Sequence, residues 1–69
     1  MKTQEYNNIA KAIDENKGIK VSFIHTDWNG KESAHIGFIA NVAANECLII
    51  RDITTHAYII KHHKDVYFA

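Results

Sequence analysis

The order of the expected elements constrains this fold most strongly: one amphipathic helix comes first, and only short strands follow. Tyr6, Ile9 and Ile13 recur at helical spacing, so we expect a helix over about residues 4–16 with these side chains on one face. Gly18 ends this pattern, because glycine is favoured just beyond the last turn of a helix. No second helical pattern appears further along the chain.

Five strands are expected between about residues 19 and 68, where apolar and polar residues alternate with a period of two. The first strand places Ile19, Val21 and Phe23 on one face. The Asn-Gly pair within Asp27–Lys31 then favours a tight hairpin turn, because both residue types tolerate positive φ. The later strands are expected at about residues 33–42, 47–51, 56–61 and 65–68.

Gly37 lies inside the longest of these expected strands. Glycine weakens a strand interior, so its position predicts a bend or a close approach of neighbouring backbone. A helix and five bent antiparallel strands in 69 residues indicate a small closed or nearly closed barrel. We therefore predict one mainly β domain over residues 1–69, a five-stranded antiparallel small barrel with the N-terminal helix over one end or face.

The small size of the chain favours self-association. A domain of this length buries only about 60% of the surface that its unfolded chain exposes, and many such domains depend on a disulfide, a metal or a partner subunit. Cys47 is the only cysteine, which excludes an internal disulfide and a paired-cysteine zinc site. The terminal segment Val66–Ala69 would expose an apolar edge in a monomer. Tyr67 and Phe68 are therefore candidate contacts for another copy or a protein partner.

Charge and cysteine content limit the partners and the compartment. Eight basic residues balance eight acidic ones, whereas a general coat for DNA or RNA usually carries a basic excess. A single unpaired cysteine favours a reducing compartment, and Met1–Glu5 lacks the apolar core of a signal peptide. The longest apolar stretch, Ile36–Ile50, contains polar residues that prevent it from spanning a bilayer. We expect a cytoplasmic protein without membrane contact.

The segment Ile59–Val66 carries the most specific resemblance to a known family. The helix-then-strands layout resembles the Sm-like small barrels, and this segment resembles the second Sm motif of the Hfq family of bacterial RNA chaperones. In that family a Tyr-Lys-His run lines a uridine-binding pore. Lys61 and His62 match the last two positions, and Ile60 stands where the tyrosine would be. The resemblance implies RNA binding by a homo-oligomeric surface that contains Lys61 and His62.

Other parts of the chain depart from the Hfq pattern or resemble a second family. The turn Ala43–Cys47 stands where the Hfq family has an aspartate and then an aromatic residue that stacks on a base. The layout is also similar to the YolD-like small barrels of Gram-positive bacteria and their mobile elements. Members of that family resemble accessory proteins, some of them linked to error-prone DNA polymerases. This second resemblance implies a protein-interaction or regulatory module.

Trp28 lies at the expected hairpin tip and has two interpretations. An exposed tryptophan could stack on a base or anchor a protein partner. A tryptophan folded back onto the barrel mouth or the helix would instead cover the core. The folded-back position is the expected one, and an exposed Trp28 is the candidate contact for nucleic acid or protein.

The five histidines do not follow any metal-binding spacing. His62 and His63 are neighbours, so on a strand they would point to opposite faces and could not serve one ion. His56 and His62 could approach each other across a turn. We expect surface or half-buried histidines, a buried structural Cys47, and no metal, cofactor or catalytic site.

Two functions follow from these patterns. The first is a non-catalytic module that binds nucleic acid, preferably RNA, as a homo-oligomer through Lys61, His62 and Trp28. The alternative is a protein-interaction or regulatory accessory factor of a bacterium or mobile element, which would use Trp28, Tyr67 and Phe68. In both cases the edge strands are expected to hold copies together.

Overall fold

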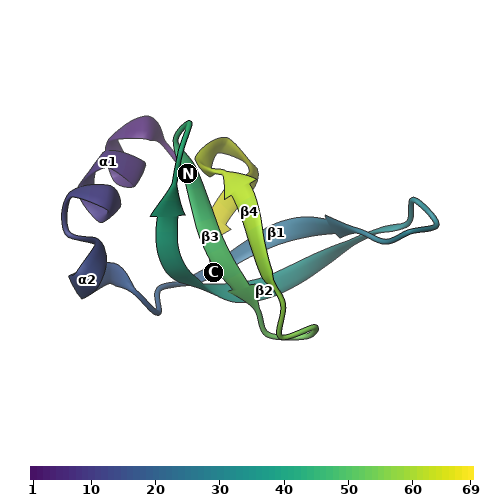
Figure 1. Ribbon diagram of the computed structural model, residues 1–69. Helices are drawn as coiled ribbons and strands as arrows, with labels where there is room; N and C mark the ends of the chain where they lie inside the picture. The colour runs from purple at the N-terminus through teal and green to yellow at the C-terminus, as the bar shows by residue number, and fades with distance from the viewer.

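The computed structural model describes residues 1–69 as one mainly β unit with two short helices at one end (Figure 1). Neither helix has the length and apolar character needed to cross a membrane. In chain order the elements are α1 (Thr3–Lys11), α2 (Ile13–Asn16), β1 (Lys20–Thr26), β2 (Glu32–Ala43), β3 (Cys47–Asp52), β4 (Tyr58–His62), the 3-10 turn η1 (His63–Asp65) and β5 (Val66–Phe68).

The predicted helix is present but divided. Its break lies at Ala12, whose φ of −130° and ψ of 49° are not helical, so α1 and α2 are separate segments. The first turn is held by Glu5, whose carboxylate accepts the backbone N–H of Lys2 at 2.9 Å. A carboxylate at this position suits the positive end of the helix.

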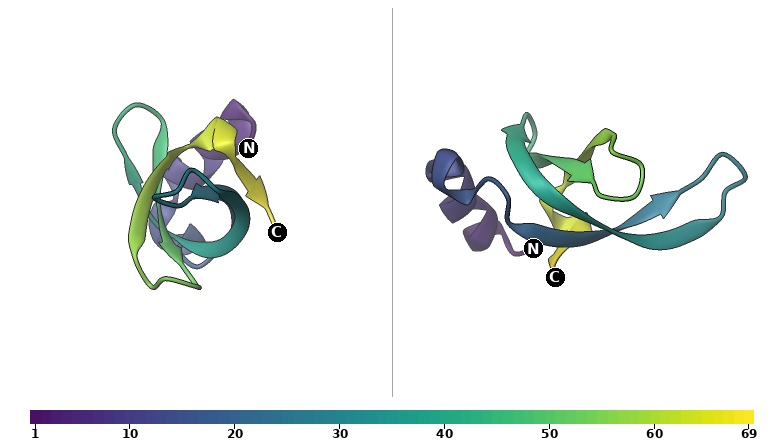
Figure 2. Two further views of the ribbon diagram at one scale, coloured as in Figure 1. Left: turned by 90° about the vertical axis from the view of Figure 1, so that its right-hand side faces the viewer. Right: turned by 90° about the horizontal axis from the view of Figure 1, so that it is seen from below.

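The five strands form one antiparallel sheet in the order β4-β3-β2-β1-β5. The sheet curls strongly (Figure 2), but β4 and β5 are its two edges and do not pair with each other. The expected closed barrel is therefore not present. After β4 the chain turns through η1 and the three residues of β5 pair with β1 alone, so no ladder joins β5 to β4 and the sheet stays open.

Gly37 makes the close approach that its position in the sequence predicts. It lies opposite Asp52 in the β2–β3 ladder. A Cβ atom at Gly37 would lie 2.5 Å from the carbonyl oxygen of Arg51 and 2.6 Å from Cγ2 of Ile50. No side chain fits there without moving backbone, so only glycine allows β2 and β3 to pack at this distance.

A β-bulge between Ile39 and Asn41 changes which face of β2 is buried. Before the bulge the core face carries His35, Gly37 and Ile39, and after it Val42 packs against the core. The bulge inserts one extra residue and bends the strand. The core that results is made of Tyr6, Ile9, Val21, Phe23, Ile39, Leu48, Ile50 and Val66.

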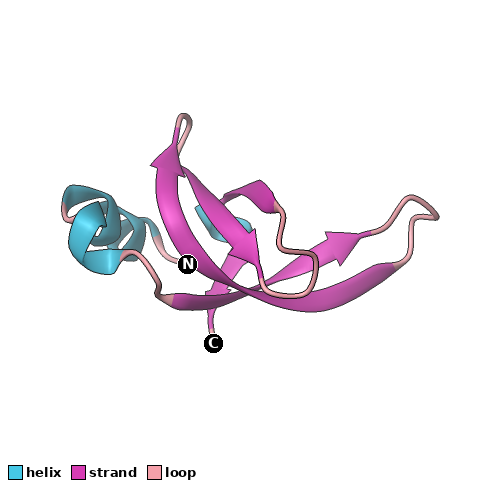
Figure 3. Ribbon diagram, turned by 60° about the horizontal axis from the view of Figure 1, so that its bottom comes forward, coloured by secondary structure: helices cyan, strands magenta, loops and turns pink.

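The β1–β2 hairpin extends beyond the sheet as an arm, on the side away from the helices (Figure 3). Its turn is ordered by Asp27, whose Oδ1 accepts the backbone N–H groups of Asn29 and Lys31, both at 2.9 Å. Trp28 lies at the tip and is 94% exposed. The expectation that Trp28 folds back is therefore wrong, because the arm holds it away from both the helices and the core.

Candidate functional site

Lys61 and His62 do not share a surface. Residues that follow one another in a strand point to opposite faces. Lys61 lies opposite the buried Leu48 and so shares the face of the core, whereas His62 lies opposite Cys47. The run that resembles the Hfq motif is thus divided between two sides of β4.

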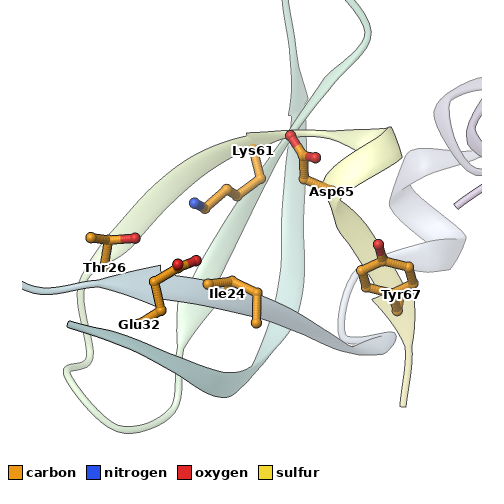
Figure 4. Close-up of a pocket in the computed structure, with 6 residues that line it drawn as sticks. All are labelled: Ile24, Thr26, Glu32, Lys61, Asp65 and Tyr67. Atoms are coloured by element: carbon orange, nitrogen blue, oxygen red, sulfur yellow. The ribbon is translucent and has the colours of Figure 1, made fainter. Parts of the chain in front are cut away.

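Lys61 instead lines a pocket of about 300 Å³ in the gap between the two edges of the sheet. Figure 4 shows its side chain extending from β4 toward Thr26 and Glu32, while Asp65 lies beside the base of that side chain and Tyr67 lies farther along, on β5. The lining contains one ammonium group and two carboxylates, so its formal charge is negative. A negative lining disfavours phosphate. Ile24 and Thr26 of β1 complete the wall.

Both edge strands carry large exposed apolar side chains. Tyr58 and Ile60 are on β4, and Tyr67 and Phe68 are on β5. Between 48% and 64% of each residue is exposed. These residues lie beside strand edges that have no hydrogen-bonding partner in the sheet. Both ends of the sheet thus combine an open edge with exposed apolar side chains.

His62 and His63 form a first histidine cluster, so the expectation that their side chains point to opposite faces is wrong. His62 ends β4 and His63 begins η1, so the chain turns between them and their ring centroids lie 4.5 Å apart. Oε2 of Glu46 lies 3.2 Å from Nε2 of His63 and 3.9 Å from Nε2 of His62. His56 lies in the loop before β4, at the opposite end of that strand, and does not meet His62.

His63 belongs to the core. It is fully buried, its Nδ1 donates to the carbonyl oxygen of Met1 at 2.9 Å, and its ring stacks on Tyr6 at 5.0 Å. Burial raises the pKa of the Tyr6 phenol, and the nearby Cys47 and Glu46 raise it further. These contacts join the first helix to the turn between β4 and β5.

A second cluster joins His25, His35 and Asp52 from three different strands. Asp52 is fully buried, and its Oδ1 accepts the backbone N–H groups of Thr54 and Thr55 at 2.8 and 3.3 Å. Its Oδ2 accepts a hydrogen bond from Nδ1 of His35 at 2.6 Å.

Asp52 is ionised in this setting. Burial raises its pKa, but the hydrogen bonds from His35 and from the two threonine amides outweigh burial and lower the pKa below its ordinary value of 3.8. Sequence reasoning did not identify this cluster. Its members lie 10 and 17 positions apart and meet only through strand pairing, so no local spacing marks them.

Comparison of the chain with family models, with curated proteins and with solved structures found no match. The resemblances to the Sm-like and YolD-like small barrels therefore stay predictions.

Proposed function

We propose that this protein is a non-catalytic binding module that assembles with copies of itself through the two edges of its sheet. The proposal rests on one observation: β4 and β5 each have one side without a partner strand, and both present exposed apolar side chains. An unpaired edge offers a row of backbone donors and acceptors to a further strand. Exposed apolar side chains beside that row favour an interface.

The two edges can satisfy each other in different copies. If β4 of one chain pairs with β5 of the next, the contact is head-to-tail, and repetition produces a ring or a filament. Such pairing would bury Ile60 and Tyr67, which are 64% and 58% exposed in the single chain. It would also supply the association that so small a core favours. We propose that each copy in this assembly is an incompletely closed small barrel of the Sm/SH3 type.

Trp28 provides a second surface for a protein partner. Tryptophan is enriched among the residues that dominate binding energy at protein interfaces, and Trp28 projects freely from the arm. The balanced net charge also suits a protein partner better than a polyanion. We place the module in the cytoplasm, because the free thiol of Cys47 persists best in a reducing compartment.

Binding of RNA through Lys61, His62 and Trp28 is the competing proposal. Lys61 and Tyr67 line one pocket and would offer an ammonium group and an aromatic ring to a nucleotide. Glu32 and Asp65 in the same lining oppose a phosphate. If the RNA proposal is right, affinity for a short uridine-rich strand falls steeply with salt and weakens in Lys61→Ala. Absence of binding at low salt by an assembled protein would remove it.

Charged substitutions on the two edges test the assembly proposal. Ile60→Lys on β4 and Tyr67→Lys on β5 each place an ammonium group in the proposed interface, so each is expected to reduce the mass measured by light scattering to that of smaller species. Ile53→Lys is the matched control, because Ile53 is 50% exposed but lies in the loop after β3. Circular dichroism would verify that all three variants fold. Unchanged mass in both edge variants would contradict the proposed interface.

A further inference from the structure

We propose that His25 and His35 bind one divalent transition-metal ion of the zinc class at the base of the arm, and that Asp52 positions His35 for it. Ring nitrogens of the two histidines and a carboxylate oxygen of Asp52 all lie within 4.8 Å of one another. Imidazole nitrogen is a preferred ligand of zinc and of neighbouring transition metals. This site is separate from the edge surfaces used for assembly.

Strand pairing brings the three residues together. His25 lies opposite Ser33 and His35 lies opposite Phe23, so the two histidines are diagonal neighbours on one face of the β1–β2 ladder. Asp52 enters from β3, where its partner in the ladder is Gly37. Because Gly37 has no side chain, β3 packs close enough for the carboxylate to reach His35.

The hydrogen bond to Asp52 prepares His35 as a ligand. The 2.6 Å contact with Oδ2 of Asp52 engages Nδ1 of His35, so Nε2 is the ring nitrogen that remains for a metal. Asp52 is itself fixed by the amide of Thr54. Carboxylates orient metal-binding histidines in this way. Nε2 has no protein partner, yet no buried side-chain nitrogen or oxygen is unpaired, so Nε2 reaches solvent.

His25 supplies the second ligand and the movement that binding requires. Neither of its ring nitrogens has a hydrogen bond within the protein, and its ring stacks on His35 with centroids 4.5 Å apart and planes 16° apart. Nearly parallel rings cannot both point at one ion about 2 Å away. His25 is half-buried and not held by hydrogen bonds, so it can turn about its side-chain torsions. Metal binding is therefore expected to break the stack.

The cluster of Glu46, His62 and His63 is less suited to bind a metal ion than the cluster of His25, His35 and Asp52. Nδ1 of His62 accepts the backbone N–H of Lys64 at 3.1 Å, which places the proton of the neutral ring on Nε2. That nitrogen is the one nearest Glu46. His62 would have to lose this hydrogen bond to bind a metal through Nε2, and His63 is fully buried.

Zinc titration of the full chain, freed of metal with a chelator and then desalted, tests the proposal. Calorimetry near neutral pH is expected to show one equivalent of Zn²⁺ bound. His25→Ala should lose this saturable binding without removing any hydrogen bond of the fold, and His62→Ala should retain it. Asp52→Asn should weaken zinc affinity by about 10–100-fold, the usual effect of removing a group that orients a ligand.

A spectroscopic measurement tests whether Asp52 positions the His35 ring for zinc or only stabilises the fold. Long-range ¹H–¹⁵N spectra of the histidine rings should show the His35 proton on Nδ1 in the free protein and zinc on Nε2 in the bound one. Absence of saturable binding, or equal losses in His25→Ala and His62→Ala, would overturn the site as adventitious histidine binding. Unchanged affinity in Asp52→Asn would overturn the role of Asp52. None of these outcomes depends on the mass of the assembly.

Discussion

Gly37→Ala is expected to lower the free energy of unfolding by about 2–3 kcal/mol, which is the cost of overpacking a tight site. The added methyl group would meet the Arg51 carbonyl oxygen at 2.5 Å, and this atom belongs to the backbone of the neighbouring strand. The ladder between β2 and β3 must open to make room. For a domain of this size the loss corresponds to a fall of roughly 8–24 °C in melting temperature, measurable by circular dichroism.

Gly30→Ala is the matched control for this prediction. Gly30 has a positive φ of 82°, but no atom lies within 4 Å of the position that a Cβ would take. The substitution therefore strains only the turn, at a cost of about 1 kcal/mol. If Gly37→Ala is no more destabilising than Gly30→Ala, this result would contradict the claim that β2 and β3 pack too closely at Gly37 to admit a side chain.

Asp52→Ala is expected to be the second large effect, a loss of about 3 kcal/mol in a urea titration with chelator present. Removing the carboxylate, which is fully buried, leaves the ring N–H of His35 and the amides of Thr54 and Thr55 without their acceptor. Asp52→Asn keeps the shape and one acceptor oxygen, so it should cost clearly less. Equal losses in both variants would contradict the hydrogen-bond account.

The ionised state of Asp52 adds a pH dependence. Because its pKa is lower in the folded chain than its ordinary 3.8, it contributes stability above that value and loses the contribution as the pH falls through the folded pKa. The stability difference between wild type and Asp52→Asn should therefore shrink below about pH 4. A difference that grows on acidification would contradict a lowered pKa.

The sequence predicts the strands well because their periodicity and turn residues act locally. The Asn-Gly turn and the alternation after Gly18 place β1 and β2 close to their observed bounds. The bulge near Ala40 carries no such local signal. Phe38, before the bulge, is exposed, whereas Val42, after it, packs against the core.

Features that depend on tertiary pairing are not predictable from local patterns. The break at Ala12 occurs without a glycine or proline. The turn from β4 into η1 brings His62 and His63 together, although a continuous strand would separate them. The link between His35 and Asp52 spans 17 positions and requires the Gly37 contact. The exposed edge position of Tyr67 and Phe68 was predictable, since Val66–Ala69 reads as a short apolar strand.

Light scattering of the wild-type protein across a wide concentration range tests the central claim most directly. Pairing of β4 with β5 between copies predicts a species with the mass of several 7.9 kDa chains, which falls toward that of one chain only on strong dilution. A mass of 7.9 kDa at every concentration, from low micromolar to millimolar, would contradict assembly through the edges.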